Sequence, residues 1–353
     1  MFRRTKNLVG LDIGSSAVKA IELKQSGRGF KVSAIGVEPV PPDSIVDGAI
    51  MDGGAVTEAI RRLFSNNKFK ARQVVASLSG SSVIVKKITL PAMTERELAD
   101  SIFWEAEQYI PFDIQDVALD YEILNPGTGA DSQGTMEVLL VAAKKDKIAA
   151  YTSAIAQAGK TPLIVDVDAF ALQNAFEANY GFDTGVVALL NAGASAININ
   201  ILSGPQSVFA RDVSTGGNAY TEAVQRELNL PYEEAEQLKK GQDVHGASFE
   251  DARPVLRAVS DNVLLEIEKT FDFFKTTAAH DHINRIMLCG GASRVDGFAA
   301  ALRDRFDTEV ESFDPFRQVA CDAAKLGVAN LDALAPVAAV AVGLALRREG
   351  DRR

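Results

Sequence analysis

The sequence has little cysteine and no long apolar run, and each shortage excludes a class of protein. Only Cys289 and Cys321 occur, both in apolar surroundings, so we expect no disulfide framework. No apolar stretch reaches the roughly 18 residues of a membrane-spanning helix. The longest, residues 335–346, predicts a buried alanine-rich helix. Residues 1–7 lack the apolar centre of a signal peptide, and we therefore expect a cytoplasmic protein.

Basic side chains are also in short supply, which argues against a general nucleic-acid binder. The chain has 37 Lys and Arg against 47 Asp and Glu, a net charge of −10. Histidine is scarce as well, and His280-Asp281-His282 has no companion motif at ligand spacing. We interpret these three residues as solvated side chains at a helix end. Hydrophobic residues make up 47% of the 353 residues, which is enough for two lobes.

A strand–turn–strand pattern near the N-terminus is the first strong feature that is present. Alternating apolar residues precede Gly14-Ser15-Ser16, and apolar character resumes after the turn. Glycine leaves its amide uncovered and serine adds a hydroxyl, and such a turn suits phosphate oxygens. Asp12 and Lys19 bracket it, where a carboxylate could hold hydrated magnesium and an amine could neutralise a terminal phosphate. Alone, the motif is equally compatible with an ordinary hairpin.

A second copy of the pattern, in residues 187–202, favours the functional interpretation. Aligned on the turns, Asp12 matches Asn191, Gly14 matches Gly193, and Ser16 matches Ser195, with Ala194 between. Such a repeat predicts a duplicated domain that holds one ligand between its two lobes.

Two further glycine-bearing turns complete the candidate site. Gly216, Gly217 and Asn218 precede a predicted helix, whose first amides would form an anion site; a flexible cap is the alternative. Gly290, Gly291 and Ala292 follow an apolar strand predicted for residues 284–288. We expect all these turns to face one cleft.

The order of predicted elements divides the chain into five parts. We expect the first lobe in residues 1–82, an inserted β–α–β–β–α subdomain in 83–159, and the return of the first lobe with a hinge in 160–184. The second lobe follows in 185–330. A C-terminal helix in 331–353 would then pack back on the first lobe.

These turns, in this order, resemble the actin, Hsp70 and sugar-kinase superfamily. The resemblance implies a duplicated actin-like α/β fold of the ribonuclease H type, with two lobes and a small α+β subdomain inserted in the first. It also implies ATP and Mg²⁺ as cofactors, with Asp12 toward the metal and Gly290 to Ala292 at adenosine. Glu236 and Lys239 fit a superfamily pattern for ribose and adenine contacts, although a solvated ion pair at helical spacing explains them equally well.

Within the superfamily, residues 88–93 and 105–112 resemble the PilM family of type IV pilus assembly proteins. That resemblance implies an ATP-binding scaffold at the inner membrane, held there through partners, which docks the N-terminal cytoplasmic tail of PilN; other pilus assembly proteins are further candidate partners. We expect residues 74–78, 83–88 and 110–112 to wall the docking groove, unless they only fill the subdomain core. Type II secretion systems contain a related fold.

Asn191 departs from a superfamily pattern that often has aspartate there. An amide can bind a metal-bound water but brings no charge, so hydrolysis is less expected than binding, and at most slow. No catalytic residue is assigned; Glu222 and Asp168 are the nearby carboxylates that could substitute. A small-molecule kinase would need a general-base aspartate. A cell-division protein like FtsA would need a C-terminal amphipathic helix, whereas residues 346–353 are highly charged.

Overall fold

The structure, a computed structural model, describes residues 7–127, 134–277 and 282–351 and contains two five-stranded sheets. The first sheet has the order β10-β6-β1-β2-β3, with β1 at Val9–Ile13, β2 at Ala17–Ser26, β3 at Gly29–Pro39, β6 at Gln73–Leu78 and β10 at Thr161–Val167. The second has the order β13-β12-β11-β14-β15, with β11 at Val186–Ala192, β12 at Ile197–Ser203, β13 at Gln206–Val213, β14 at Arg285–Cys289 and β15 at Glu309–Ser312.

The two sheets have one topology, which confirms the duplicated two-lobe fold. In each, an antiparallel meander of three strands (β1-β2-β3 and β11-β12-β13) is extended by two parallel strands, β6 and β10 in one and β14 and β15 in the other. A strand that pairs in parallel needs a long crossover connection. Those crossovers carry the helices and the inserted subdomain.

The inserted subdomain is a three-stranded antiparallel sheet with one helix on it. Its order is β7-β9-β8, with β7 at Val83–Pro91, β8 at Val117–Asn125 and β9 at Thr135–Lys144, and helix α2 spans Glu95–Glu107. Thr94 and Glu97 form a capping box at the start of α2. Helix α3, Lys145–Gln157, buries Tyr151 and Ile155 in the core of the first lobe. The five boundaries expected from the sequence, including that at residue 159, stay predictions.

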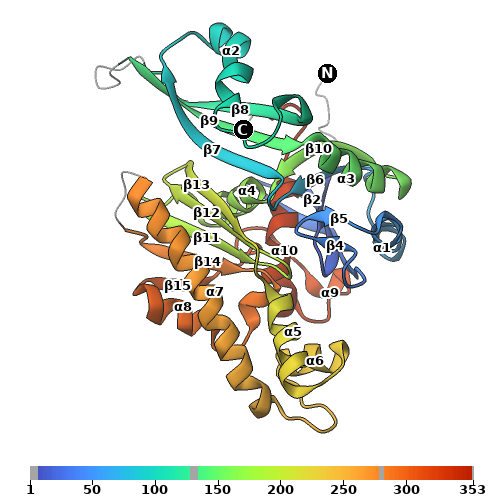
Figure 1. Cartoon of the computed structure of the whole chain (residues 1–353). Helices are drawn as coiled ribbons and strands as arrows, with labels where there is room; N and C mark the ends of the chain where they lie inside the picture. The colour runs from blue at the N-terminus through green and yellow to red at the C-terminus, as the bar shows by residue number, and fades with distance from the viewer. Residues whose placement is uncertain (1–6, 128–133, 278–281, 352–353) are drawn as a thin grey trace.

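Two helices lie between the lobes and join them. Helix α4, Asp168–Tyr180, and helix α10, Leu331–Leu346, share a hydrophobic core with side chains of both large sheets. Figure 1 shows α10 near the centre of the molecule, with α4 beside it. A Cβ atom at Gly343 of α10 would overlap the Ala171 carbonyl of α4, so the close approach of the helices requires glycine. Helix α10 extends the predicted apolar helix of residues 335–346 by one turn at its N-terminus.

The remaining elements cover the outer faces of the sheets. In the first lobe, α1 at Gly53–Asn66 and the hairpin β4–β5 at Ile45–Val46 and Ala49–Ile50 lie beside the sheet. In the second lobe lie α5 at Gly217–Leu228, α6 at Tyr232–Lys239, α7 at Phe249–Thr277 and α8 at Phe298–Phe306. Short elements are the 3₁₀ helices η1 at Ile114–Asp116 and η2 at Gly291–Arg294, and α9 at Ala323–Leu326.

No helix in the described ranges is both long and apolar enough to cross a membrane. His280 and Asp281, considered above as metal ligands, lie outside the described residues, as does most of the polar loop before β9.

Candidate functional site

The first hairpin presents an ion pair beside a tight turn. Strands β1 and β2 place Asp12 opposite Lys19, and Asp12 Oδ2 lies 2.8 Å from Lys19 Nζ. The turn closes because the Gly14 N–H donates to the Ala17 carbonyl at 3.1 Å. Both charged side chains are mostly covered, with 16% of Lys19 and 12% of Asp12 exposed. The pair therefore lies at the bottom of a cleft, with its charges only weakly screened by water.

The second hairpin repeats this geometry with neutral groups. The Gly193 N–H donates to the Ala196 carbonyl at 2.9 Å, and β11 and β12 place Asn191 opposite Asn198. Asn191 Nδ2 donates to Asn198 Oδ1 at 2.9 Å. An amide pair thus stands where the first hairpin has its ion pair, so of the two hairpins only the first carries a basic side chain at this position.

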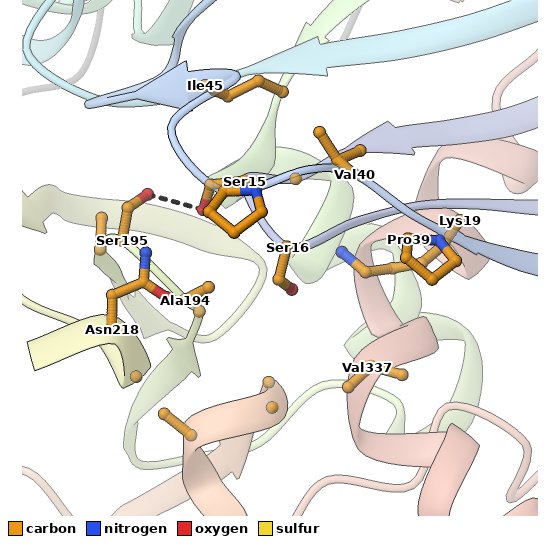
Figure 2. A pocket seen from close by; sticks show the side chains of 18 of the residues that line it. Ser15, Ser16, Lys19, Pro39, Val40, Ile45, Ala194, Ser195, Asn218 and Val337 are labelled. Atoms are coloured by element: carbon orange, nitrogen blue, oxygen red, sulfur yellow. Dashed lines mark hydrogen bonds between the residues drawn. The ribbon is translucent and has the colours of Figure 1, made fainter. Parts of the chain in front are cut away.

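The two turns meet across the cleft. The Ser15 hydroxyl donates to the Ser195 hydroxyl over an Oγ–Oγ distance of 2.9 Å. Figure 2 shows this bond, with Ser16 and Lys19 on the first-lobe side of the pocket and Ala194, Ser195 and Asn218 on the other. The serines of both turns therefore face one space, as the aligned motifs predict.

The third turn closes the floor of this space from β14. Gly290 has φ of 87°, and a Cβ atom there would overlap the backbone of Ala192, so the turn requires glycine. Its N–H donates to the Pro336 carbonyl of α10 at 2.8 Å. Gly291 and Ala292 begin the 3₁₀ helix η2, which brings a stretch of backbone without large side chains to the cleft.

The prediction that the first amides of α5 form an anion site is wrong, because these amides already have partners. The N–H groups of Gly217 and Asn218 donate to the carbonyls of Gly193 and Ala194 at 2.9 and 2.7 Å. These amides hold the second hairpin and are engaged before any ligand arrives. Gly216 serves the same contact, because a Cβ atom there would lie 2.6 Å from the Ala194 carbonyl oxygen.

Glu236 and Lys239 on α6 do form an ion pair, but a largely buried one. Their side chains are 17% and 12% exposed, and Lys239 also donates to Thr221 Oγ1 at 2.8 Å and to the Gly217 carbonyl at 3.1 Å. The hydrogen bonds from Lys239 and Thr221 outweigh burial and hold the pKa of Glu236 below its usual range. The pair ties α6 to the start of α5 and lines the same cleft.

A cleft of about 1090 Å³ lies between the lobes and collects most of the predicted residues. The predicted residues that line it are Asp12, Gly14, Ser15, Ser16, Lys19, Asn191, Gly193, Ala194, Ser195, Gly217, Asn218, Glu236, Lys239, Gly290, Gly291 and Ala292. Gly216 lies behind the lining, and Glu222 does not line the cleft, whereas Asp168 does.

Comparison with known proteins identifies the family. The model of the family described as type IV pilus assembly protein PilM matches residues 10–349. A chain in the solved PilM–PilN type IV pilus biogenesis complex is 30% identical, with a TM-score of 0.86, and the match covers 97% of this chain and 98% of that one. The chain belongs to the PilM family.

More distant solved structures share the fold of this PilM-family chain. The ethanolamine utilization protein EutJ from Carboxydothermus hydrogenoformans is 15% identical with a TM-score of 0.57, over 97% of this chain and 89% of that one. MreB5 of Spiroplasma citri, solved bound to AMPPNP, is 14% identical with a TM-score of 0.52, over 96% and 95%. Both are similar across nearly the whole chain, which agrees with the actin-like fold.

Sequence reasoning missed several residues of the cleft in this PilM-family protein. They come from the end of β3 and the loop after it, the β4–β5 turn, the loop before β7, strand β12, the 3₁₀ helix η2, and helices α3, α6 and α10: Pro39, Val40, Pro41, Pro42, Asp47, Ser79, Gly80, Tyr151, Asn198, Tyr232, Gln237, Arg294 and Val337. Most lie outside the repeated hairpins and the glycine turns chosen from the sequence, so the motif comparison did not mark them. Asn198 alone carried a signal, because it is a polar residue within an apolar strand.

Asp168 has the most perturbed carboxyl in the cleft. Burial, and then the negative charge of Asp12, raise its pKa to about 6, although Ser77 Oγ donates to Asp168 Oδ1 at 2.5 Å. A carboxylate with this pKa can accept a proton near neutral pH.

The metal prediction rests on Asp12 alone. Within the described residues, no group of three or more His, Cys, Asp or Glu side chains could hold a metal ion without a ligand's help. Magnesium keeps several waters and is often bound through one or two carboxylates plus phosphates. The single carboxylate therefore fits a cation that arrives with a nucleotide.

Proposed function

We propose that this PilM-family protein binds Mg²⁺–ATP between its two hairpins and serves as a scaffold that docks the N-terminal tail of PilN. The observation that carries the nucleotide proposal is the pair of like turns meeting over one cleft at Ser15 and Ser195. Two glycine turns that offer amides and hydroxyls to one space suit a chain of phosphates. Family membership supports the assembly role and argues against the kinase and FtsA-like alternatives.

The cleft offers groups for each part of the nucleotide. Lys19 and the two turns would hold the phosphates, and Asp12 would contact the water shell of magnesium. The backbone at Gly290 and the pair Glu236–Lys239 would hold the nucleoside. The volume of about 1090 Å³ matches the upper range of small-molecule sites, roughly 300–1,000 Å³, before the lobes close.

We propose that hydrolysis is slow or absent. Asn191 brings no charge to the second hairpin and cannot accept a proton as a base. Asp168 is the available carboxylate, but it shares its negative surroundings with Asp12. Nucleotide would then hold the lobes in one arrangement rather than drive rapid turnover.

The docking surface for PilN needs one correction. Strand β6, residues 73–78, lies between β1 and β10 and its apolar side chains are buried, so it cannot wall a groove. Ile110 is buried in the subdomain core. We place the groove between the edge strand β10 and the face of the small sheet opposite α2.

That opposite face has a small apolar patch on β7 and β9. Val138 and Leu140 of β9 pack in the core with α2, so Val141 points to the other side, where it pairs with Val85 and both side chains are half-buried. An extended tail could gain main-chain hydrogen bonds from an edge strand and specificity from apolar pockets. Docking to PilN would hold the protein at the inner membrane through its partner.

Nucleotide binding is tested by thermal unfolding. Nucleotide at about a hundred times its Kd would stabilise the fold by roughly 2.7 kcal/mol and raise Tm by several degrees. No shift with ATP or ADP at millimolar concentration would refute this half of the proposal.

PilN docking is tested by titrating a synthetic N-terminal PilN peptide. Val141→Glu should weaken binding at least tenfold, because it places a charge in an apolar groove. Phe103→Glu, at an apolar position of α2 that is 51% exposed on the other side of the same sheet, is the matched control and should bind like the wild type. Equal binding by both variants would place the groove elsewhere.

A further inference from the structure

Strand β12 carries a nearly buried asparagine on its cleft side, opposite its core-facing isoleucines. Asn198 is 5% exposed, with Ile197 and Ile199 on either side buried in the second-lobe core. Burying an amide costs free energy unless its hydrogen bonds are satisfied. Asn198 is satisfied by Asn191 on one side and Asp212 on the other. Because burying this amide costs free energy, we looked for a role of Asn198 beyond packing.

The bonds form a directed chain across the lobes. Asn191 Nδ2 donates to Asn198 Oδ1 at 2.9 Å, and Asn198 Nδ2 donates to Asp212 Oδ1 at 2.8 Å. Asp212 Oδ2 accepts the N–H of Gly80, which belongs to the first lobe. The chain thus joins the second hairpin, through β13, to the loop that starts β7.

An ionised carboxylate sets the direction of this chain, because it can only accept hydrogen bonds. Asn198 must therefore turn its NH₂ group to Asp212 and its oxygen to Asn191. Asn191 must in turn give its NH₂ group to Asn198. Its oxygen, Oδ1, takes no part in this chain; it accepts from Cys289 Sγ at 3.8 Å, and Asn191 lines the cleft.

Because Gly80 belongs to the first lobe and Asp212 to the second, the direction of this hydrogen-bond chain depends on the relative position of the two lobes. The Gly80 carbonyl accepts the Val83 N–H at 3.0 Å at the start of β7, and Lys147 Nζ donates to the neighbouring Ser79 carbonyl. If the lobes separated, Asp212 would lose one of the two donors that keep its carboxylate charged. Burial raises the pKa of Asp212, and the bonds from Asn198 and Gly80 oppose that rise.

We propose that Asp212 is a positioning residue which, through Asn198, turns the Asn191 side-chain oxygen toward the hydrated cation of the bound nucleotide. The oxygen then serves in place of the carboxylate that this hairpin lacks. The proposal rests on nucleotide binding in the cleft, as proposed above. It assigns the second lobe's contact with the cation to the neutral side chain of Asn191, which charged Asp212, two strands away, holds in place through Asn198.

The experiment measures the magnesium concentration that gives half of the ATP-induced rise in Tm. Asp212→Asn can accept only one of the two bonds and frees the amides to reverse, so that concentration should rise about tenfold, the value of one lost hydrogen bond. Asp272→Asn, which removes an exposed carboxylate from α7, is the control and should not change it. The Tm rise with magnesium-free ADP should be similar in all three proteins.

A double variant separates positioning from a structural role. The double variant Asn191→Asp with Asp212→Asn moves the carboxylate to the other end of the hydrogen-bond chain. The Asn198 amide can then reverse, and residue 191 presents an oxygen to the cation in either of its orientations. This variant should restore the wild-type magnesium dependence. Asn198→Leu, of similar volume, should lose it even if Asp212→Asn does not fold.

Unchanged magnesium dependence in Asp212→Asn, or in Asn198→Leu should the first variant not fold, would overturn the proposal. So would failure of the folded double variant to recover. Absence of any nucleotide-induced shift in the wild-type chain would overturn the proposed nucleotide site as well. A shift that is present but insensitive to Asp212 would overturn the positioning role alone.

Discussion

At the scale of single residues, the two hairpins differ in charge although their backbones match. The pair Asp12–Lys19 and the pair Asn191–Asn198 hold the same register positions, yet only the first is ionic. A phosphate that enters the cleft would replace Asp12 as the ionic partner of Lys19. Substitutions in the first hairpin should therefore change phosphate binding, and substitutions in the second hairpin should change cation binding.

Gly14→Val should remove nucleotide binding and leave the fold intact. A Cβ atom at Gly14 would lie 2.8 Å from Lys19 Nζ, the movable end of a long side chain, and 3.2 Å from the Ala17 carbonyl oxygen, so the amine would move away and the turn would shift by only a few tenths of an ångström. We expect the ATP-induced rise in Tm to vanish while the ligand-free Tm stays within about 2 °C of the wild type, as one lost contact would allow. A variant that binds ATP normally would exclude the first turn from the site.

Asp168→Asn should stabilise the ligand-free protein at neutral pH and do little near pH 4. The folded-state pKa of about 6 lies above the ordinary 3.8, so the folded chain binds this proton more tightly than the unfolded chain does. Stability from this group is therefore lost as pH rises between these values, and the charge is a cost above them. We expect a Tm gain of about 2 °C at pH 7. Unfolding curves across this pH range measure it, and an equal gain at every pH would contradict it.

At the scale of elements, the contact between α10 and α4 links the two lobes. Their shared core draws side chains from both large sheets, and its closest approach is at Gly343 and Ala171. Because a helix interior tolerates little added volume, this glycine is a sensitive point of the fold.

Gly343→Leu should destabilise the protein by about 2 kcal/mol or more, since the helices would have to move apart. Urea unfolding followed by circular dichroism gives the change. Gly53→Leu is the control, because a Cβ atom at Gly53 of α1 meets open space. Similar losses in both variants would mean that leucine itself, and not the crossing, is responsible.

At the scale of the whole molecule, the lobes touch through few polar bridges on the cleft side. Ser15 to Ser195 and Gly80 to Asp212 cross between them. A ligand that contacts both hairpins would add bonds of the same kind and favour the closed arrangement.

The double variant Ser15→Ala with Ser195→Ala should open the ligand-free protein. Small-angle scattering should show a radius of gyration above the roughly 20 Å expected for a compact chain of this length. Saturating Mg²⁺–ATP should return it to the wild-type value, because the phosphates would replace the lost bridge. An unchanged radius without nucleotide would show that α4 and α10 alone set the closure.

The sequence by itself determined what depends on neighbours along the chain. Alternating apolar residues around Gly14 and Gly193 specify strands and turns through local backbone geometry, and their repetition predicted the duplicated fold and the turns that face the cleft. Only the tertiary structure decided which groups meet from distant elements. It showed that the first amides of α5 are already bonded, that β6 is interior to its sheet, and that Asp212 reaches Gly80. These facts depend on strand order and on the packing of one lobe against the other, and no periodicity within a segment encodes them.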